Sequence, residues 1–225
     1  AAPTAEETAY LLQQAQRHPE VLGVVGWIDM LAADALAQVA HCAALPLLKG
    51  LRPMLQDLDD PDWILQPAIQ PVLAAMARHG LVFDALIQPV HLPRMLALTQ
   101  AHPDLTVVVD HGAKPVIDAL AMDAWAQAMT ELARETHPDR VVCKMSGLWT
   151  EAPKGQPVEV VRPWCEALLA IWGPERLLWG SDWPVLEMAG AYGAWRTLSL
   201  EVLSQLSPEQ KNAVLGDNAR RIYRL

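Results

Sequence analysis

The sequence predicts a parallel α/β barrel. About six short hydrophobic runs alternate with helical segments at roughly 30-residue spacing. The runs lack the polar alternation of a half-exposed strand, which is typical of parallel strands covered by helices. Polar residues gather where each run ends. An open doubly wound sheet fits the alternation too, but only in a barrel do the carboxyl ends of all strands meet at one mouth, so the polar ends favour the barrel.

The elements follow from local patterns along the chain. Thr4 and Glu7 have the spacing of a capping box and begin the first helix. Asp34 and Asp62 are expected to open the next two helices. The expected strands are 21–30, 47–53, 81–87, 105–110, 140–145 and 176–179. The later helices are expected at 34–44, 62–80, 92–101, 122–135, 158–172, 194–206 and 209–216. The polar residues at the strand ends are Asp29, Arg52, Asp84, Gln88, Asp110, His111, Lys144, Ser146, Ser181 and Asp182.

The strand count falls short of a closed barrel. Such a barrel has eight strands, so its first one or two βα units are expected to be missing, at the end where the chain opens on a helix. Residues 1–4 also lack an initiator Met. Either signal cleavage has left this terminus or the sequence begins inside the natural protein, and the strand count favours the second. Residues 1–225 are expected to form a single barrel domain that is incomplete at its N-terminal side.

Composition excludes several classes of protein. Of the 225 residues, 52% are hydrophobic, which is enough for one large core. The formal net charge is −9, and the 17 Lys and Arg residues form no basic stripe for nucleic acid or a membrane. The three cysteines are widely spaced, so neither a disulfide framework nor a zinc knuckle is expected. No apolar run approaches the roughly 20 residues that cross a bilayer, and the sequence predicts a cytoplasmic protein.

Asp182 carries the clearest chemical signal. The segment LLWGSDWP brings an apolar strand to Gly180, Ser181 and Asp182 between two tryptophans. A carboxylate at a strand end beside apolar rings is partly desolvated, which suits a general base or a metal ligand. The alternative is that Asp182 only caps the turn that follows.

Three other strand ends offer useful side chains. In TVVVDHGAKP, Gly112 leaves the imidazole of His111 room to face a ligand. Lys144 stands inside the apolar strand VVCKMSG, and Arg52 leaves a strand in KGLRP, where a cation suits a carboxylate or sugar oxygen. Each residue also has a structural interpretation. His111 could be a hydrogen-bonded structural histidine, Lys144 a solvated surface charge, and Arg52 a residue that anchors a neighbouring loop.

Other catalytic patterns are missing from the sequence. There is no G-x-S-x-G elbow, so Ser146 and Ser181 are poor nucleophile candidates. H-E-x-x-H, H-x-H and a glycine-rich phosphate loop are also missing. Asp84, Trp27 and Trp183 are expected to contact the substrate at the mouth.

The motifs DHGAKP, KMSGL and WGSDWP, in this order and at barrel spacing, resemble the second amidohydrolase family of the amidohydrolase superfamily. Within it they are most similar to the subgroup that includes L-fuconolactonase, L-rhamnonolactonase-type enzymes and pyrone-dicarboxylate lactonase. The similarity extends over essentially all 225 residues. The resemblance implies a distorted (β/α)8 barrel of the metal-dependent-hydrolase type. It also implies a hydrolase of carbohydrate metabolism that opens an L-fucono- or L-rhamnonolactone-like sugar-acid lactone.

The resemblance also implies functional residues. The family places an H-x-H pair on the first strand, a histidine on a later strand and an aspartate on the eighth. His111 and Asp182 match the last two, while the H-x-H pair has no counterpart, so about 50–60 further residues are expected before Ala1. In the expected reaction Asp182 activates water and later returns the proton to the ring oxygen. His111, Lys144 and Arg52 stabilise the oxyanion.

No cofactor is expected to be required. The Lys144 ammonium would repel Zn²⁺, although a divalent metal such as zinc, if bound, would take His111 and Asp182 as ligands. The expected partner is a small-molecule lactone, with no nucleic acid and no membrane. Two alternatives remain: a metal-dependent decarboxylase of the same superfamily, and an inactive partial barrel.

Overall fold

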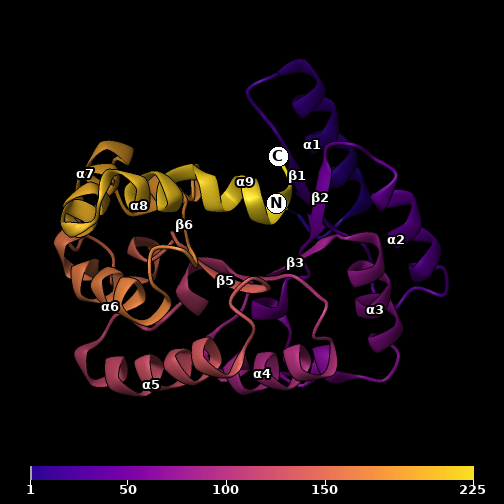
Figure 1. The fold of residues 1–225 in the computed structure, drawn as a ribbon, viewed down its shortest axis with the longest axis horizontal. Coiled ribbons are helices and arrows are strands. Elements are labelled where there is room, and N and C mark those ends of the chain that lie inside the picture. The colour runs from indigo at the N-terminus through magenta and orange to yellow at the C-terminus, as the bar shows by residue number, and fades with distance from the viewer. Residues whose placement is uncertain (1) are drawn as a thin grey trace.

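A curled parallel sheet forms the centre of the structure. The computed structural model describes residues 2–225, which form one sheet of six strands in the order β1-β2-β3-β4-β5-β6. The strands are β1 Val24–Gly26, β2 Leu48–Leu51, β3 Val82–Ala85, β4 Val107–Val109, β5 Val141–Met145 and β6 Leu177–Trp179. Every neighbouring pair is parallel. The sheet curls so that its β1 and β6 edges turn toward each other (Figure 1). The predicted parallel α/β architecture is therefore confirmed, and the curl agrees with a TIM-type fold.

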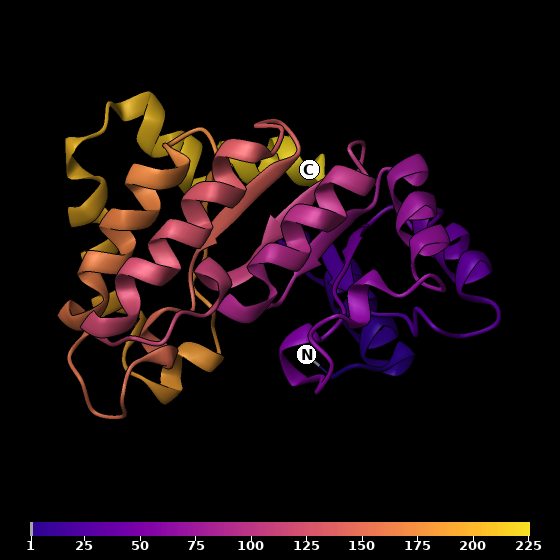
Figure 2. The same cartoon turned by 90° about the horizontal axis from the view of Figure 1, so that it is seen from below.

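Helices cover both faces of the sheet, most of them the convex face (Figure 1). The helices are α1 Ala5–Arg17, α2 Ala35–Ala43, α3 Gln70–His79, α4 Leu92–Ala101, α5 Ala119–Glu135, α6 Arg162–Trp172, α7 Tyr192–Val202, α8 Pro208–Asn212 and α9 Asn218–Tyr223. The start of α1 is as predicted, because Thr4 Oγ1 accepts a hydrogen bond from Glu7 N at 3.2 Å. α4, α5 and α6 pack in succession along the sheet (Figure 2). None of the helices within residues 2–225 is long and apolar enough to span a membrane.

The strands are apolar on both faces because each face is covered. The core beneath the convex-side helices contains strand residues Phe83, Val107, Val109, Val141, Cys143 and Leu177. A second cluster contains the alternate strand residues Val82, Val108, Val142 and Leu178. These pack against Ile222 of α9, so α9 covers the concave face (Figure 1). Double coverage explains why the strands show no polar alternation in the sequence.

The helix predicted to begin at Asp62 is wrong in its extent. Asp62 precedes only a 3-10 turn, Trp63–Leu65, and α3 begins at Gln70. Pro67 is the physical reason, because a residue before proline avoids the helical region. Gln66 accordingly has φ −56° and ψ 139°, which ends the turn.

The helix predicted at 209–216 is also incomplete. α8 passes through a π-helical turn, Ala213–Asp217, and continues into α9, which the sequence analysis missed. Asn218 anchors this segment, since its buried amide donates to the carbonyls of Pro174 and Leu177 at 2.7 and 2.8 Å. The anchor fixes α9 against the β6 edge.

Candidate active site

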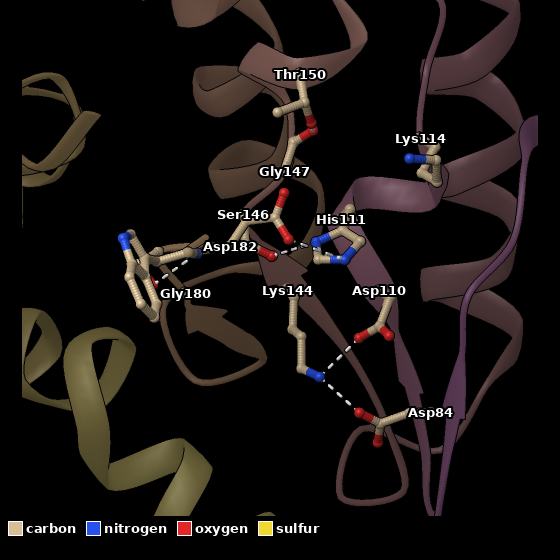
Figure 3. Close-up of polar contacts among 12 residues, drawn as sticks. Asp84, Asp110, His111, Lys114, Lys144, Ser146, Gly147, Thr150, Gly180 and Asp182 are labelled. Atoms are coloured by element: carbon tan, nitrogen blue, oxygen red, sulfur yellow. Dashed lines mark hydrogen bonds and ion pairs between the residues drawn. The ribbon is translucent and has the colours of Figure 1, made fainter. Parts of the chain in front are cut away.

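Polar side chains from β3 to β6 meet at the carboxyl ends of the strands. Asp84 belongs to β3 and Lys144 to β5, while Asp110 and His111 follow β4 and Asp182 follows β6. Because neighbouring strands are parallel, these ends lie at one edge of the sheet. Figure 3 shows the carboxylates of Asp84 and Asp110 facing Lys144 at one level, with His111 and Asp182 at the next.

The lower level is a buried charge cluster. Lys144 Nζ lies 2.6 Å from Asp84 Oδ2 and 2.7 Å from Asp110 Oδ1. Both carboxylates are essentially inaccessible to solvent. The Tyr223 hydroxyl donates to both oxygens of Asp84 at 2.9 Å, and Arg52 Nη1 lies 3.5 Å from Asp110 Oδ2. These five residues form the buried charge cluster: two lie in strands, Asp110 and Arg52 directly follow strands, and Tyr223 lies in α9. Its positive and negative charges compensate one another.

The protonation of the cluster follows from its contacts. Burial opposes the charge on Lys144, but the carboxylates of Asp110 and Asp84 outweigh it and hold the pKa of Lys144 well above its usual value. Burial likewise opposes the charge on Asp110. The neighbouring cations, Lys144 first among them, still keep the pKa of Asp110 below its usual value. Lys144 is therefore a fixed positive charge beneath the site.

His111 connects Ser146 to Asp182. Its Nδ1 lies 2.8 Å from Ser146 Oγ and its Nε2 lies 3.6 Å from Asp182 Oδ1. Gly147 permits this arrangement, since a Cβ there would come within 2.6 Å of the imidazole Cγ. The side chains of His111 and Asp182 keep 13% and 14% of their surface exposed, which is enough to meet a small molecule.

Burial shifts the proton affinities of both groups. It lowers the pKa of His111, despite the nearby Asp110 and Asp182 carboxylates, so the imidazole is neutral near pH 7. It raises the pKa of Asp182, against the opposing effect of His111 and Lys114. A carboxylate with raised proton affinity beside a neutral imidazole is suited to general base catalysis.

A left-handed turn positions His111. Four consecutive residues have positive φ: His111 at 53°, Gly112 at 58°, Ala113 at 61° and Lys114 at 47°. Trp125 Nε1 holds the turn by donating to Gly112 O at 2.8 Å. Such a backbone costs about 1–2 kcal/mol for each residue other than glycine. The surrounding structure thus holds the chain in an unfavourable form next to the site.

The other predicted contacts lie around this centre. Arg52 reaches the buried charge cluster, and Trp27 lines a shallow hollow beside it. Trp27 follows β1, which is shorter than predicted because the Trp27 N–H bonds to Thr8 Oγ1 at 2.8 Å. Trp183 is 63% exposed, and its indole donates to Glu187 at 2.9 Å. Asp84 lies deeper, with its carboxylate engaged inside the protein.

Three further residues of this region had no role assigned to them from the sequence. Ser146 contacts His111, and Tyr223 completes the buried charge cluster. The charge of Lys114 acts to lower the pKa of both His111 and Asp182. The spacing of Ala219, Ile222 and Tyr223 could have predicted a helix with these residues on one face. It could not have predicted that Tyr223 contacts Asp84 of β3, because the two residues are 139 positions apart.

The described residues do not by themselves fit a metal centre. His111 and Asp182 are suitable donor types for a divalent metal. Within residues 2–225, however, no group of three His, Cys, Asp or Glu side chains could hold an ion. The fixed charge of Lys144 lies directly beneath.

A desolvated aspartate and a neutral histidine thus meet at the carboxyl ends of the strands of a curled parallel sheet, an arrangement that suits hydrolysis. The chain belongs to the amidohydrolase family, whose model, described as "Amidohydrolase", matches residues 1–225. This match confirms the family that the three motifs indicated.

Two curated relatives are lactonases. An L-fucono-1,5-lactonase of Burkholderia ambifaria is 46% identical over 99% of this chain and 77% of its own length. An L-fucono-1,5-lactonase of Burkholderia multivorans is 33% identical over 98% of this chain and 77% of its own.

Solved structures share the fold. The crystal structure of an amidohydrolase from Burkholderia multivorans with bound zinc has a TM-score of 0.92 and 33% identity, over 100% of this chain and 81% of that one. A putative 2-pyrone-4,6-dicarboxylic acid hydrolase from Pseudomonas putida has a TM-score of 0.74 and 28% identity, over 96% and 77% of the two chains.

Proposed function

We propose that the protein hydrolyses a sugar-acid lactone of the L-fucono- or L-rhamnonolactone kind, with Asp182 as the base that activates water. The observation that carries the proposal is the pairing of Asp182 with His111 in a chain 46% identical to an L-fucono-1,5-lactonase. The raised pKa of Asp182 supports it, because a better proton acceptor is a better general base.

The reaction needs one carboxylate for two proton transfers. Asp182 takes a proton from water as the water oxygen attacks the lactone carbonyl carbon. His111 steadies the resulting oxyanion, and the Lys144 charge favours it from below. As the intermediate collapses, the carbon–oxygen bond of the ring breaks, and protonated Asp182 gives its proton to the leaving alkoxide. Lactone and water thereby become one hydroxy acid, and Asp182 returns to its carboxylate form.

The remaining predicted residues have supporting roles in this proposal. Arg52 binds a substrate oxygen on the side of Asp110, and Trp27 and Trp183 border the entrance. Asp84 acts through Lys144, because Lys144 and Tyr223 already engage its carboxylate. Zinc bound by the Burkholderia multivorans amidohydrolase leaves metal binding open for this chain, but the proposed steps require no metal.

We also propose that the curled sheet is part of a closed eight-stranded barrel, with further strands between β6 and β1. The curl supports this, since the two edges turn toward each other (Figure 1). A protein extended by any upstream coding sequence should then show a higher melting temperature and a higher lactonase activity, because its sheet edges become paired. Equal melting and activity with and without it would contradict the closed barrel.

The pH dependence of lactone opening tests the role of Asp182. With L-fucono-1,5-lactone as substrate, kcat/KM should fall as the pH drops through the pKa of Asp182. Only the carboxylate accepts a proton, and burial places this pKa above that of an ordinary aspartate. The measurement is a pH-stat rate profile before and after dialysis against a chelator, and we expect the two profiles to coincide. A rate that rises toward acid pH, or no turnover of any sugar lactone, would contradict the proposal.

A further inference from the structure

An ion pair that the proposed reaction does not use lies on the outer side of the site. Lys114 Nζ contacts Glu151 Oε1, joining the loop after β4 to the 3-10 turn Trp149–Glu151 after β5. The two side chains retain 20% and 22% of their surface. Figure 3 shows Lys114 on the side of His111 opposite Lys144. The carboxylate of Glu151 is therefore open to a ligand, unlike the fully buried carboxylates of Asp84 and Asp110.

The left-handed turn brings this pair to the site. Lys114 is the last of its four residues and lies three positions after His111, whose carbonyl accepts a hydrogen bond from Lys114 N at 2.9 Å. Lysine gains nothing from a positive φ of 47°, whereas glycine would adopt it freely. Backbone strain of this kind is concentrated at ligand-binding and catalytic positions. The strained turn therefore holds Lys114 next to His111 at the site.

The charge of Lys114 reaches both reacting groups. Its ammonium contributes to lowering the pKa of His111 and opposes the rise in the pKa of Asp182. Glu151, its partner, stands between Thr150 and Ala152, which line a cavity of about 400 Å³. The residues on either side of Glu151 thus border a space large enough for part of a sugar ring.

We propose that Lys114 and Glu151 together bind two neighbouring hydroxyl groups of the lactone. The ammonium donates to one hydroxyl oxygen, and the carboxylate accepts the O–H of the next. An ion pair offers a donor and an acceptor side by side, which is the arrangement that a vicinal diol requires. This inference rests on the proposed lactonase function and names the site that selects polyhydroxylated substrates.

The test compares two six-membered lactones that differ in ring hydroxyls. L-fucono-1,5-lactone carries them and δ-valerolactone does not. Lys114→Met and Glu151→Gln should each lower kcat/KM for the sugar lactone about 10- to 100-fold, the usual effect of one lost charge-assisted hydrogen bond. Hydrolysis of δ-valerolactone, measured at a pH where Asp182 is ionised in every variant, should fall far less than hydrolysis of the sugar lactone, because it has no hydroxyl groups for the pair to bind. Lys211→Met and Glu131→Gln on the outer helices are the matched controls and should leave both rates unchanged.

The outcomes separate this inference from the proposed function. An equal loss on both lactones, or a loss that follows a lower melting temperature, would make the pair structural and overturn the inference. Unchanged turnover of the sugar lactone in both variants would also overturn it. If the unaltered protein opens neither lactone, the proposed function fails, and this inference fails with it. If it opens only the sugar lactone, a loss of this activity in both stable variants, but not in the Lys211→Met and Glu131→Gln controls, still supports diol binding.

Discussion

Asp182→Asn is expected to lower kcat for sugar-lactone hydrolysis by roughly 10²–10⁴, the usual effect of removing a general base. Asparagine is nearly isosteric with aspartate but cannot accept the proton from water. The fold should survive, because residue 182 has a φ of 58° and asparagine is among the residues that tolerate this region best. The effect should therefore appear in turnover and not in stability.

Single-turnover and steady-state rates, together with thermal melting, check this result. Asp123→Asn, an exposed carboxylate on α5, is the matched control and should behave as the unaltered protein does. Near-normal turnover by Asp182→Asn would contradict a catalytic role. Asp182 would then have only a structural role, in the turn where its carbonyl accepts a hydrogen bond from Leu186 N.

The second large effect is expected in stability. Lys144→Met keeps the length of the side chain but removes the cation between Asp84 and Asp110, both fully buried. Breaking a buried ion pair by removing one partner costs about 3–5 kcal/mol. We expect a loss of this size in the free energy of unfolding near neutral pH, measured by urea denaturation.

The pH dependence of this variant identifies the cause. Without the ammonium, burial and mutual repulsion raise the pKa of one or both carboxyl groups above the unfolded value. The folded variant then binds more protons than the unfolded chain, so its stability falls as the pH rises. The deficit should be smaller at pH 5 than at pH 7.5, and Lys211→Met should show none. A deficit below about 1 kcal/mol at neutral pH would contradict the structural role of the cluster.

Local patterns in the sequence were sufficient to predict most of the fold. α4 lies where it was expected, 92–101, and each predicted strand contains an observed one. The strands are shorter than predicted because apolar runs extend beyond the residues that pair. β1 is the clearest case, with Val21 and Leu22 exposed ahead of it. Boundaries controlled by proline, as at Gln66, were accessible in the sequence but were missed.

The candidate site, too, could be predicted only in part from the sequence. Strand-end position brought Asp182, His111, Lys144 and Arg52 into consideration, and the structure places them in contact with one another or with Asp110. Contacts between distant segments could not be derived, because no local pattern records them. Tyr223 against Asp84 is one example. The φ values of the left-handed turn are another, since Ala113 and Lys114 are not residues that favour it.

The contact between Tyr223 and Asp84 has a consequence for how the protein is made. Asp84 leaves the ribosome long before Tyr223, which lies 139 residues later. Until then the buried cluster lacks a hydrogen-bond donor, and the concave face, including Val82 and Val108, lacks the cover of Ile222. Closing so long a loop is slow relative to local helix formation. The strands and outer helices can therefore form during synthesis, whereas the concave side of the sheet is completed only after α9 has been translated.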